Sequence, residues 1–258
     1  MSAQQPRIVC QFSCGAASAV ATKLALAQYS ATHDVQIINA FLANEHEDNR
    51  RFLLDCQQWF GKEITQLRDE KYGADIIQVF RRERFMRGRN GAPCTKLLKR
   101  RLLDGWKQPG DVMVFGYTAE EVDRLEDFRE RNPDRPVIAP LIERGLGKED
   151  CKAIIQRAGI ELPMMYRLGY ENANCIGCVK GGEGYFRAIR EDFPDQFEEL
   201  CKIQDELGKG SYLFRNRSTN VRFSLRDLGD GVVRRNEQLP ACSFFCEMAE
   251  ADLSELVV

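Results

Sequence analysis

Residues 7–29 read RIVCQFSCGAASAVATKLALAQY. The apolar run at 7–12 is typical of a buried strand, the small residues at 13–18 of a tight loop, and the Ala- and Leu-rich run at 19–29 of a helix. A strand that passes through small residues into a helix is the first half of a βαβ unit. This stretch therefore predicts an α/β fold that begins close to the N-terminus.

The same alternation continues to about residue 158. We predict strands at 34–41, 111–117 and 136–141, and helices at 50–60, 119–130 and 147–158. Strands that alternate with helices form a parallel sheet with helices on both faces. We therefore expect a doubly wound, mostly parallel α/β sheet, whose ligands bind beyond the carboxyl ends of the strands.

The character of the sequence changes near residue 165. Glycines and cysteines gather at 169–184, helix-like segments follow to about 208, and the remainder is irregular. We expect a nucleotide-binding α/β domain at 1–165 and a small cysteine-containing region, helical and irregular, at 166–258 packed on it.

The composition limits the classes of protein to consider. The 258 residues are 43% hydrophobic and 29% charged, with a net charge of −2, which is ordinary for a globular chain and excludes a mainly disordered one. The N-terminus carries no pattern of a secretory signal, and no apolar run reaches the ~18 residues that span a bilayer. We expect a cytoplasmic protein with no membrane partner.

The loop at 13–18 carries the first chemical signal. Ser13, Gly15 and Ser18 form S-x-G-x-x-S between a predicted strand and helix. A glycine lets the backbone approach a ligand closely, and the amino end of a helix attracts phosphate. A plain serine-capped turn would have the same pattern, so the loop alone leaves both interpretations open.

The segment QFSCGAASAV at 11–20 resembles the PP-loop of the adenine nucleotide α-hydrolase superfamily, whose fold is HUP-like. The usual loop is S-G-G-x-D-S, and here Cys14 and Ala17 replace the second-position glycine and the aspartate. Further segments resemble phosphoadenylyl-sulfate-reductase-like proteins of the kind often carried by bacteriophages. They are ANEHEDNRRFLLDCQQWFG at 43–61, APCTKLLKRRL at 92–102, VFGYTAEEVDRLEDF at 114–128, APLIE at 139–143 and MMYRLGYENANCIGCVKGG at 164–182.

This resemblance implies an ATP-dependent enzyme that releases pyrophosphate, with Mg²⁺ bridging the phosphates. Ser13, Gly15 and Ser18 would bind the pyrophosphate, and Glu45 would lie near the nucleotide. The resemblance also assigns catalytic roles to Lys99, Glu121 and Arg124. Thr118 stands where relatives usually have arginine.

The ten cysteines are unusual for a chain without a secretory signal, and they suggest thiols that serve metals or catalysis. Cys175 and Cys178 form C-x-x-C, a spacing at which both thiolates can bind one metal or cluster. Three interpretations remain open: a 4Fe–4S cluster, a structural Zn²⁺ held by the two C-terminal pairs, or unliganded thiols. The candidate ligands are Cys94, Cys175, Cys178, Cys242 and Cys246.

Two arginine-rich stretches could bind phosphate groups. One covers residues 81–101, and the other covers 215–226 with aromatic residues close by. Either stretch could equally be a solvated surface. The partners that we consider are an adenine nucleotide, a nucleic-acid substrate (tRNA or DNA), a sulfur-donor protein and a second copy of the chain.

Three functions compete at this point. The first is an ATP-dependent PP-loop enzyme of the ATP pyrophosphatase type, acting in sulfur transfer with an iron–sulfur cluster. The second is a sulfonucleotide reductase, but the C-terminal ACSFFCEM at 241–248 lacks the E-C-G-x-H type motif of that nucleophile. The third is a non-catalytic nucleotide- or nucleic-acid-binding protein with a structural zinc.

Overall fold

The structure is a computed structural model that describes residues 7–88 and 91–239. The chain forms two compact units, which we call the sheet unit and the cysteine unit. The sheet unit comprises the residues up to Phe41, Glu47–Leu67 and Leu103–Met164, and the cysteine unit comprises Leu42–His46, Arg68–Leu102 and the residues from Met165 on. The predicted division near residue 165 coincides with one of these boundaries, but two earlier segments also belong to the cysteine unit.

Five parallel strands form the sheet, in the order β3-β2-β1-β4-β5. They are β1 (Ile8–Gln11), β2 (Val35–Ala40), β3 (Thr65–Leu67), β4 (Val112–Val114) and β5 (Val137–Ile138). Ile8 pairs with Val35 on one side and with Val112 on the other, so β1 lies at the centre. The predicted α/β class and parallel sheet are confirmed.

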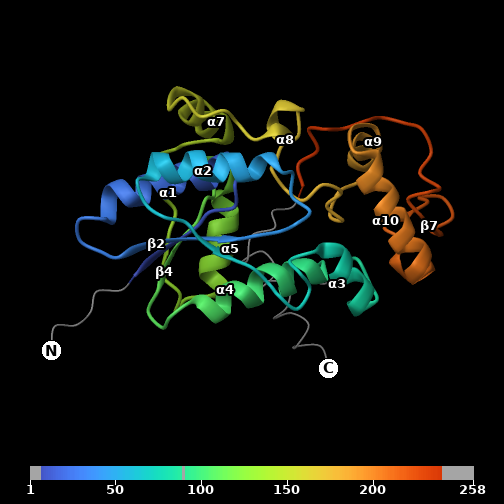
Figure 1. The fold of residues 1–258 in the computed structure, drawn as a ribbon, viewed down its shortest axis with the longest axis horizontal. Coiled ribbons are helices and arrows are strands. Elements are labelled where there is room, and N and C mark those ends of the chain that lie inside the picture. The colour runs from blue at the N-terminus through green and yellow to red at the C-terminus, as the bar shows by residue number, and fades with distance from the viewer. Residues whose placement is uncertain (1–6, 89–90, 240–258) are drawn as a thin grey trace. The chain divides into compact units, whose positions relative to one another are not determined.

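Helices flank this sheet. Those of the sheet unit are α1 (Ala16–Tyr29), α2 (Asp48–Phe60), the 3₁₀ turn η2 (Ala119–Glu121), α5 (Val122–Arg131), α6 (Pro140–Glu143) and α7 (Lys148–Arg157). Helix α1 packs on β1, α2 and α7, and Figure 1 shows α1 and α2 running side by side. Phe12 is fully buried, with its ring 6.1 Å from that of Phe52 in α2. Burial of such side chains supplies the main free energy of folding.

Some predicted elements need correction. The predicted strand 136–141 is wrong beyond Ile138, because Pro140 begins α6. Proline suits the first turn of a helix, where its missing N–H has no intrahelical acceptor. The predicted strand 111–117 ends at Val114, and the predicted helix 119–130 begins with a 3₁₀ turn.

The cysteine unit is mainly helical. Its elements are α3 (Ile76–Glu83), the π-helical turn η1 (Thr95–Arg100), α9 (Glu183–Asp192), α10 (Pro194–Leu207), the 3₁₀ turn η3 (Lys209–Ser211), β6 (Phe214–Arg215) and β7 (Arg222–Phe223). Two short helices, α4 (Arg101–Trp106) and α8 (Met164–Arg167), begin at the boundaries between the units. Helix α10 packs on α9 and α3, and Phe186, Ile189 and Ile203 are fully buried in this core. None of the helices described in 7–88 and 91–239 has both the length and the apolar character needed to cross a membrane.

Candidate functional site

The loop at 13–18 folds around the hydroxyl of Ser18. The Ser18 Oγ accepts hydrogen bonds from the Ser13 N–H and the Ser13 hydroxyl, both at 3.1 Å, and donates to the Gly15 carbonyl at 2.9 Å. Ser18 is 8% exposed, whereas Ser13 is exposed. The two serines therefore differ in role: Ser18 shapes the loop from inside, and Ser13 lies on its solvent side.

Cys14 takes a strained backbone conformation in this loop. Its φ is +57°, a left-handed value that costs a non-glycine residue roughly 1–2 kcal/mol. The Asn39 side chain at the end of β2 donates to the Phe12 carbonyl at 2.8 Å and to the Cys14 sulfur at 3.7 Å. Asn39 and the buried thiol thus hold the loop in a conformation that glycine would adopt without strain.

A second loop lies directly against the first. Gly116 follows β4, and a Cβ added there would lie 3.1 Å from both the Cα and the N of Ser18. In the order β3-β2-β1-β4-β5, β2 and β3 are added on one side of β1 and β4 and β5 on the other, so the strand order reverses at β1 and β4. Ligands in open α/β sheets bind at such a point, beyond the carboxyl ends of the strands. The loops after β1 and β4 therefore form the candidate nucleotide site of the sheet unit.

Glu121 and Arg124, two predicted catalytic residues, form an ion pair with each other. The Glu121 carboxylate also accepts a hydrogen bond from the Thr118 N–H at 3.1 Å, which closes a capping box at the start of η2. The Arg124 guanidinium lies 4.6 Å from the centre of the Tyr117 ring. The pair follows the Gly116 loop, and these contacts fix the direction of both side chains.

The third predicted catalytic residue, Lys99, belongs to the cysteine unit together with Glu45. Lys99 Nζ lies 3.7 Å from Glu45 Oε1, and the two side chains are only 12% and 10% exposed. Lys99 sits in the π-helical turn η1, where the Arg101 N–H bonds to the Lys96 carbonyl. Such turns are frequent at functional sites because they displace one side chain from the regular helical position.

The C-x-x-C segment is built into the core of the cysteine unit. Cys175 forms a backbone bridge with Glu45, and Gly177 has a φ of +70° that turns the chain between the cysteines. The Tyr185 hydroxyl accepts from the Cys178 N–H at 3.0 Å and donates to the Cys175 carbonyl at 3.3 Å. This ring therefore supports the turn that carries both thiols.

Cys94 packs against the same core cluster as Cys175 and Cys178, directly before η1. Within residues 7–88 and 91–239, no three His, Cys, Asp or Glu side chains form a group that could hold a metal ion. The other two predicted ligands, Cys242 and Cys246, lie outside the described residues.

Four cysteines outside the candidate ligand set, Cys10, Cys56, Cys151 and Cys201, are buried. Burial raises the pKa of the Cys10 and Cys151 thiols to about 12 and of the Cys201 thiol to about 11. Cys56 is fully buried, and burial raises its pKa as well. The expected buried, apolar character of Cys56, Cys151 and Cys201 is confirmed, because all three side chains are buried. Burial in apolar surroundings favours the protonated thiol.

The two arginine-rich stretches meet at one pocket of the cysteine unit, of about 1020 Å³. Of its arginines, one comes from the first stretch and three come from the second. Arg187 of α9, Arg234 and Glu237 also line it, and no sequence pattern indicated these three. The arginines that line it are Arg87, Arg187, Arg215, Arg217, Arg222 and Arg234.

Two other arginines of these stretches form ion pairs within the protein. Arg81 pairs with Glu206, and Arg226 pairs with Glu198 and Asp205. Arg81 and Arg226 are therefore exposed surface residues with ion-pair partners. Arg87, in contrast, is half-buried. Burial lowers the pKa of Arg87, the Cys178 charge opposes this shift, and the positive charge of Arg222 adds to it.

Comparison of the sequence with models of known protein families gives no match, and neither does comparison with curated proteins. The functional argument therefore rests on the residues of this chain.

Proposed function

We propose that the chain is an ATP-dependent enzyme of the PP-loop, ATP pyrophosphatase type that acts in sulfur transfer. One observation carries this proposal: the loop with Ser13, Gly15 and Ser18 follows the central strand β1, at the reversal point of the strand order. Phosphates favour this position because the N–H groups and the positive dipole end of a following helix face it.

The proposed reaction has two steps. An acceptor oxygen attacks the α-phosphorus of ATP, the bond to the β-phosphate oxygen breaks, and pyrophosphate leaves with the bonding electron pair. The acceptor proton passes to solvent. Sulfide supplied by a donor then attacks the activated acceptor carbon, a C–S bond replaces the C–O bond, and AMP leaves with the oxygen.

The chain's own residues would support the first step as follows. The loop after β1 would hold the leaving pyrophosphate, and the Ser13 hydroxyl, which donates to Ser18 in the structure, would turn to donate to a phosphate oxygen. Mg²⁺ would supply positive charge to the phosphates. Arg124 would add positive charge as the pyrophosphate departs, while Glu121 and the Tyr117 ring orient it. The resemblance assigns Lys99 to the same step.

The cysteines fit a thiolate-held group in part. Cys175 and Cys178 share one turn, and Cys94 packs in the same cluster. Cys94, Cys175, Cys178, Cys242 and Cys246 are the residues that would hold a 4Fe–4S cluster, or a zinc ion in the alternative. A bound cluster would supply sulfur binding or electron transfer.

Nucleotide products test the proposal. The full chain, purified without oxygen, is incubated with Mg²⁺, sulfide, ATP labelled at the α- and γ-phosphates and a pool of candidate acceptors. We expect AMP and pyrophosphate, and we expect Ser13→Ala to lower the rate at least about tenfold, the loss expected for one hydrogen bond to a charged group. Ser30→Ala, exposed at the other end of α1, is the matched control and should keep the rate.

Three other outcomes contradict the proposal. Formation of ADP and phosphate would place the cleavage at the wrong bond. Release of sulfite from phosphoadenylyl sulfate with a thiol donor, in the absence of ATP, would identify a sulfonucleotide reductase. Saturable nucleotide binding without any product, in a protein that contains zinc, would identify the non-catalytic binding protein.

A further inference from the structure

The arginine-lined pocket of the cysteine unit contains several arginines that bond to neutral oxygens rather than to carboxylates. Arg81, Arg226 and Arg235 lie outside it, and each is held by one or two carboxylates. Inside the pocket, Arg187 is paired with Glu183, but backbone carbonyls take the place of carboxylates around Arg87. Arg87 donates to the carbonyls of Val179 and Leu213 at 2.8 and 3.0 Å.

Two pocket arginines on the β6–β7 hairpin, Arg215 and Arg222, also donate to neutral oxygens. Arg215 donates to the carbonyl and side-chain oxygens of Asn220, and Arg222 donates to the Gly210 carbonyl at 2.8 Å. A carbonyl orients a guanidinium without cancelling its charge. Among the residues that the structure describes, neither Arg217 nor Arg234 has a carboxylate partner. The positive charge of these side chains therefore remains available to an anion.

The two glutamates that line the pocket offset only part of the charge of its six arginines. Glu183 is paired with Arg187 at 2.9 Å. Glu237 accepts hydrogen bonds from the Gly182 and Tyr185 N–H groups at 2.6 and 3.2 Å, so it caps the amino end of α9. Both carboxylates are committed to the protein's own donors, and the pocket keeps a net positive field.

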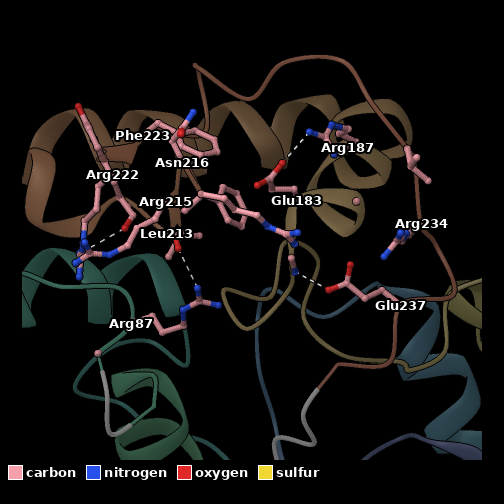
Figure 2. A pocket seen from close by; sticks show the side chains of 17 residues that line it. Arg87, Glu183, Arg187, Leu213, Arg215, Asn216, Arg222, Phe223, Arg234 and Glu237 are labelled. Atoms are coloured by element: carbon pink, nitrogen blue, oxygen red, sulfur yellow. Dashed lines mark hydrogen bonds and ion pairs between the residues drawn. The ribbon is translucent and has the colours of Figure 1, made fainter. Parts of the chain in front are cut away.

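The shape and lining indicate an extended ligand with several phosphates. Figure 2 shows Arg215 and Arg222 on one side of the pocket and Arg187 and Arg234 on the other. Tyr212, Phe214 and Phe223 also line it, and the rings of Tyr212 and Phe223 are only partly buried. Arginines that track a backbone, interleaved with aromatic rings on which bases stack, are the features of single-strand binding sites.

We propose that this pocket binds a single strand of nucleic acid, with arginines on its two sides contacting successive phosphates and an aromatic ring stacking on a base. Arg87 connects it to the C-x-x-C segment, because the Val179 carbonyl that it holds directly follows Cys178. A bound strand would therefore lie next to the cysteine turn. The inference names a ligand for a site separate from the loop after β1, and it does not depend on ATP turnover.

Binding of a labelled ~12-nucleotide single strand to the full chain tests this, by fluorescence polarisation without ATP over a series of salt concentrations. We expect Arg215→Ala and Arg234→Ala, from opposite sides of the pocket, each to weaken binding about tenfold. Each should also lower the slope of log K against log salt by about one, the change expected for one lost phosphate contact.

Arg226→Ala is the matched control, because Arg226 is exposed but paired with carboxylates outside the pocket. It should change the affinity less than twofold, and circular dichroism should show that all three variants fold. An equal loss in Arg226→Ala, or unchanged binding in both pocket variants, would overturn the proposal. Displacement of the strand from the wild type by micromolar inorganic triphosphate would also overturn it, since the pocket would then be a small-polyphosphate site.

Discussion

Gly116 lies so close to Ser18 that a single added carbon would reach the Ser18 backbone: a Cβ on Gly116 would lie 3.1 Å from its Cα and N. The loop after β4 thus packs on the loop after β1 through backbone atoms of Ser18 and Ala17. The position of the candidate nucleotide loop depends on this contact.

Gly116→Ala tests that dependence. The new methyl group must push the Ser18 backbone by a few tenths of an ångström, so we expect ATP to bind about tenfold more weakly. Overpacking of this kind costs roughly 1–3 kcal/mol in the free energy of unfolding. Calorimetric titration of a non-hydrolysable ATP analogue, with urea unfolding alongside, measures both quantities.

Gly105→Ala in α4 is the matched control, since a Cβ there has no heavy atom within 4 Å. Alanine in a helix should leave stability unchanged or raise it by up to about 1 kcal/mol. Unaltered nucleotide affinity in Gly116→Ala would show that the loop does not depend on the Gly116 contact.

Cys14 provides a second test of the loop. Both Cys14→Gly and Cys14→Ala remove the thiol, but only glycine tolerates the φ of +57° without strain. We expect the glycine variant to be more stable than the alanine variant by roughly 1 kcal/mol. Urea unfolding of the two proteins measures the difference, and an alanine variant at least as stable as the glycine variant would contradict the left-handed conformation.

The ion pair between Lys99 and Glu45 makes a prediction about coupling. Removal of either charge takes this ion-pair partner from the other, nearly buried charge. The losses of unfolding free energy in the two single variants should therefore sum to more than the loss in the double variant. We expect Lys99→Met and Glu45→Gln to show a coupling energy of about 0.5–3 kcal/mol in a double-mutant cycle. Additive losses would mean that the two side chains do not interact.

Asp192 makes a prediction about pH. Arg235 binds its carboxylate with two hydrogen bonds of 2.7 Å, and the Tyr170 hydroxyl donates a third. The Arg235 bonds hold the pKa of Asp192 below its usual value, despite partial burial, and Tyr170 lowers it further. A carboxyl whose pKa is lowered by folding stabilises the protein above its unfolded pKa of about 3.9, and this contribution is lost as the pH falls through the lower, folded value.

Asp192→Asn should therefore destabilise the protein by about 1.5–3 kcal/mol near neutral pH, the size of a charge-assisted hydrogen bond. The difference in unfolding free energy between the variant and the wild type should disappear as the pH falls from about 5 toward about 2. Asp230→Asn removes an exposed partner of Arg190 and should cost less than about 1 kcal/mol near neutral pH. A gap for Asp192→Asn that stays constant down to acid pH would contradict the ion pair.

The sequence predicted the fold where local patterns are strong. The apolar run at 7–12 and the small residues at 13–18 are sufficient to predict β1 and its loop. A buried strand requires apolar residues, and a tight loop requires small ones. Strand β3 was not predicted, since Thr65 and Gln66 are exposed and carry no apolar alternation.

Features that depend on contacts between residues far apart in the sequence could not be predicted. No local pattern indicates that the segment Arg68–Leu102 joins the residues from Met165 on in one unit. The same limit applies to the pocket, where Arg87 meets arginines more than a hundred positions away along the chain. Both arginine-rich stretches were noticed from the sequence, but which members are paired with carboxylates depends on partners such as Glu198 and Glu206.

The most direct test of the account is hydrogen exchange of the full chain with and without a non-hydrolysable ATP analogue and Mg²⁺. We predict slower exchange of the backbone amides in the peptide covering residues 13–18, saturating with the analogue and weakened in Ser13→Ala. Exchange in residues 210–224 should not change. Saturable protection of 210–224 with none at 13–18 would contradict the account, because the nucleotide would then bind the arginine-lined pocket rather than the loop after β1.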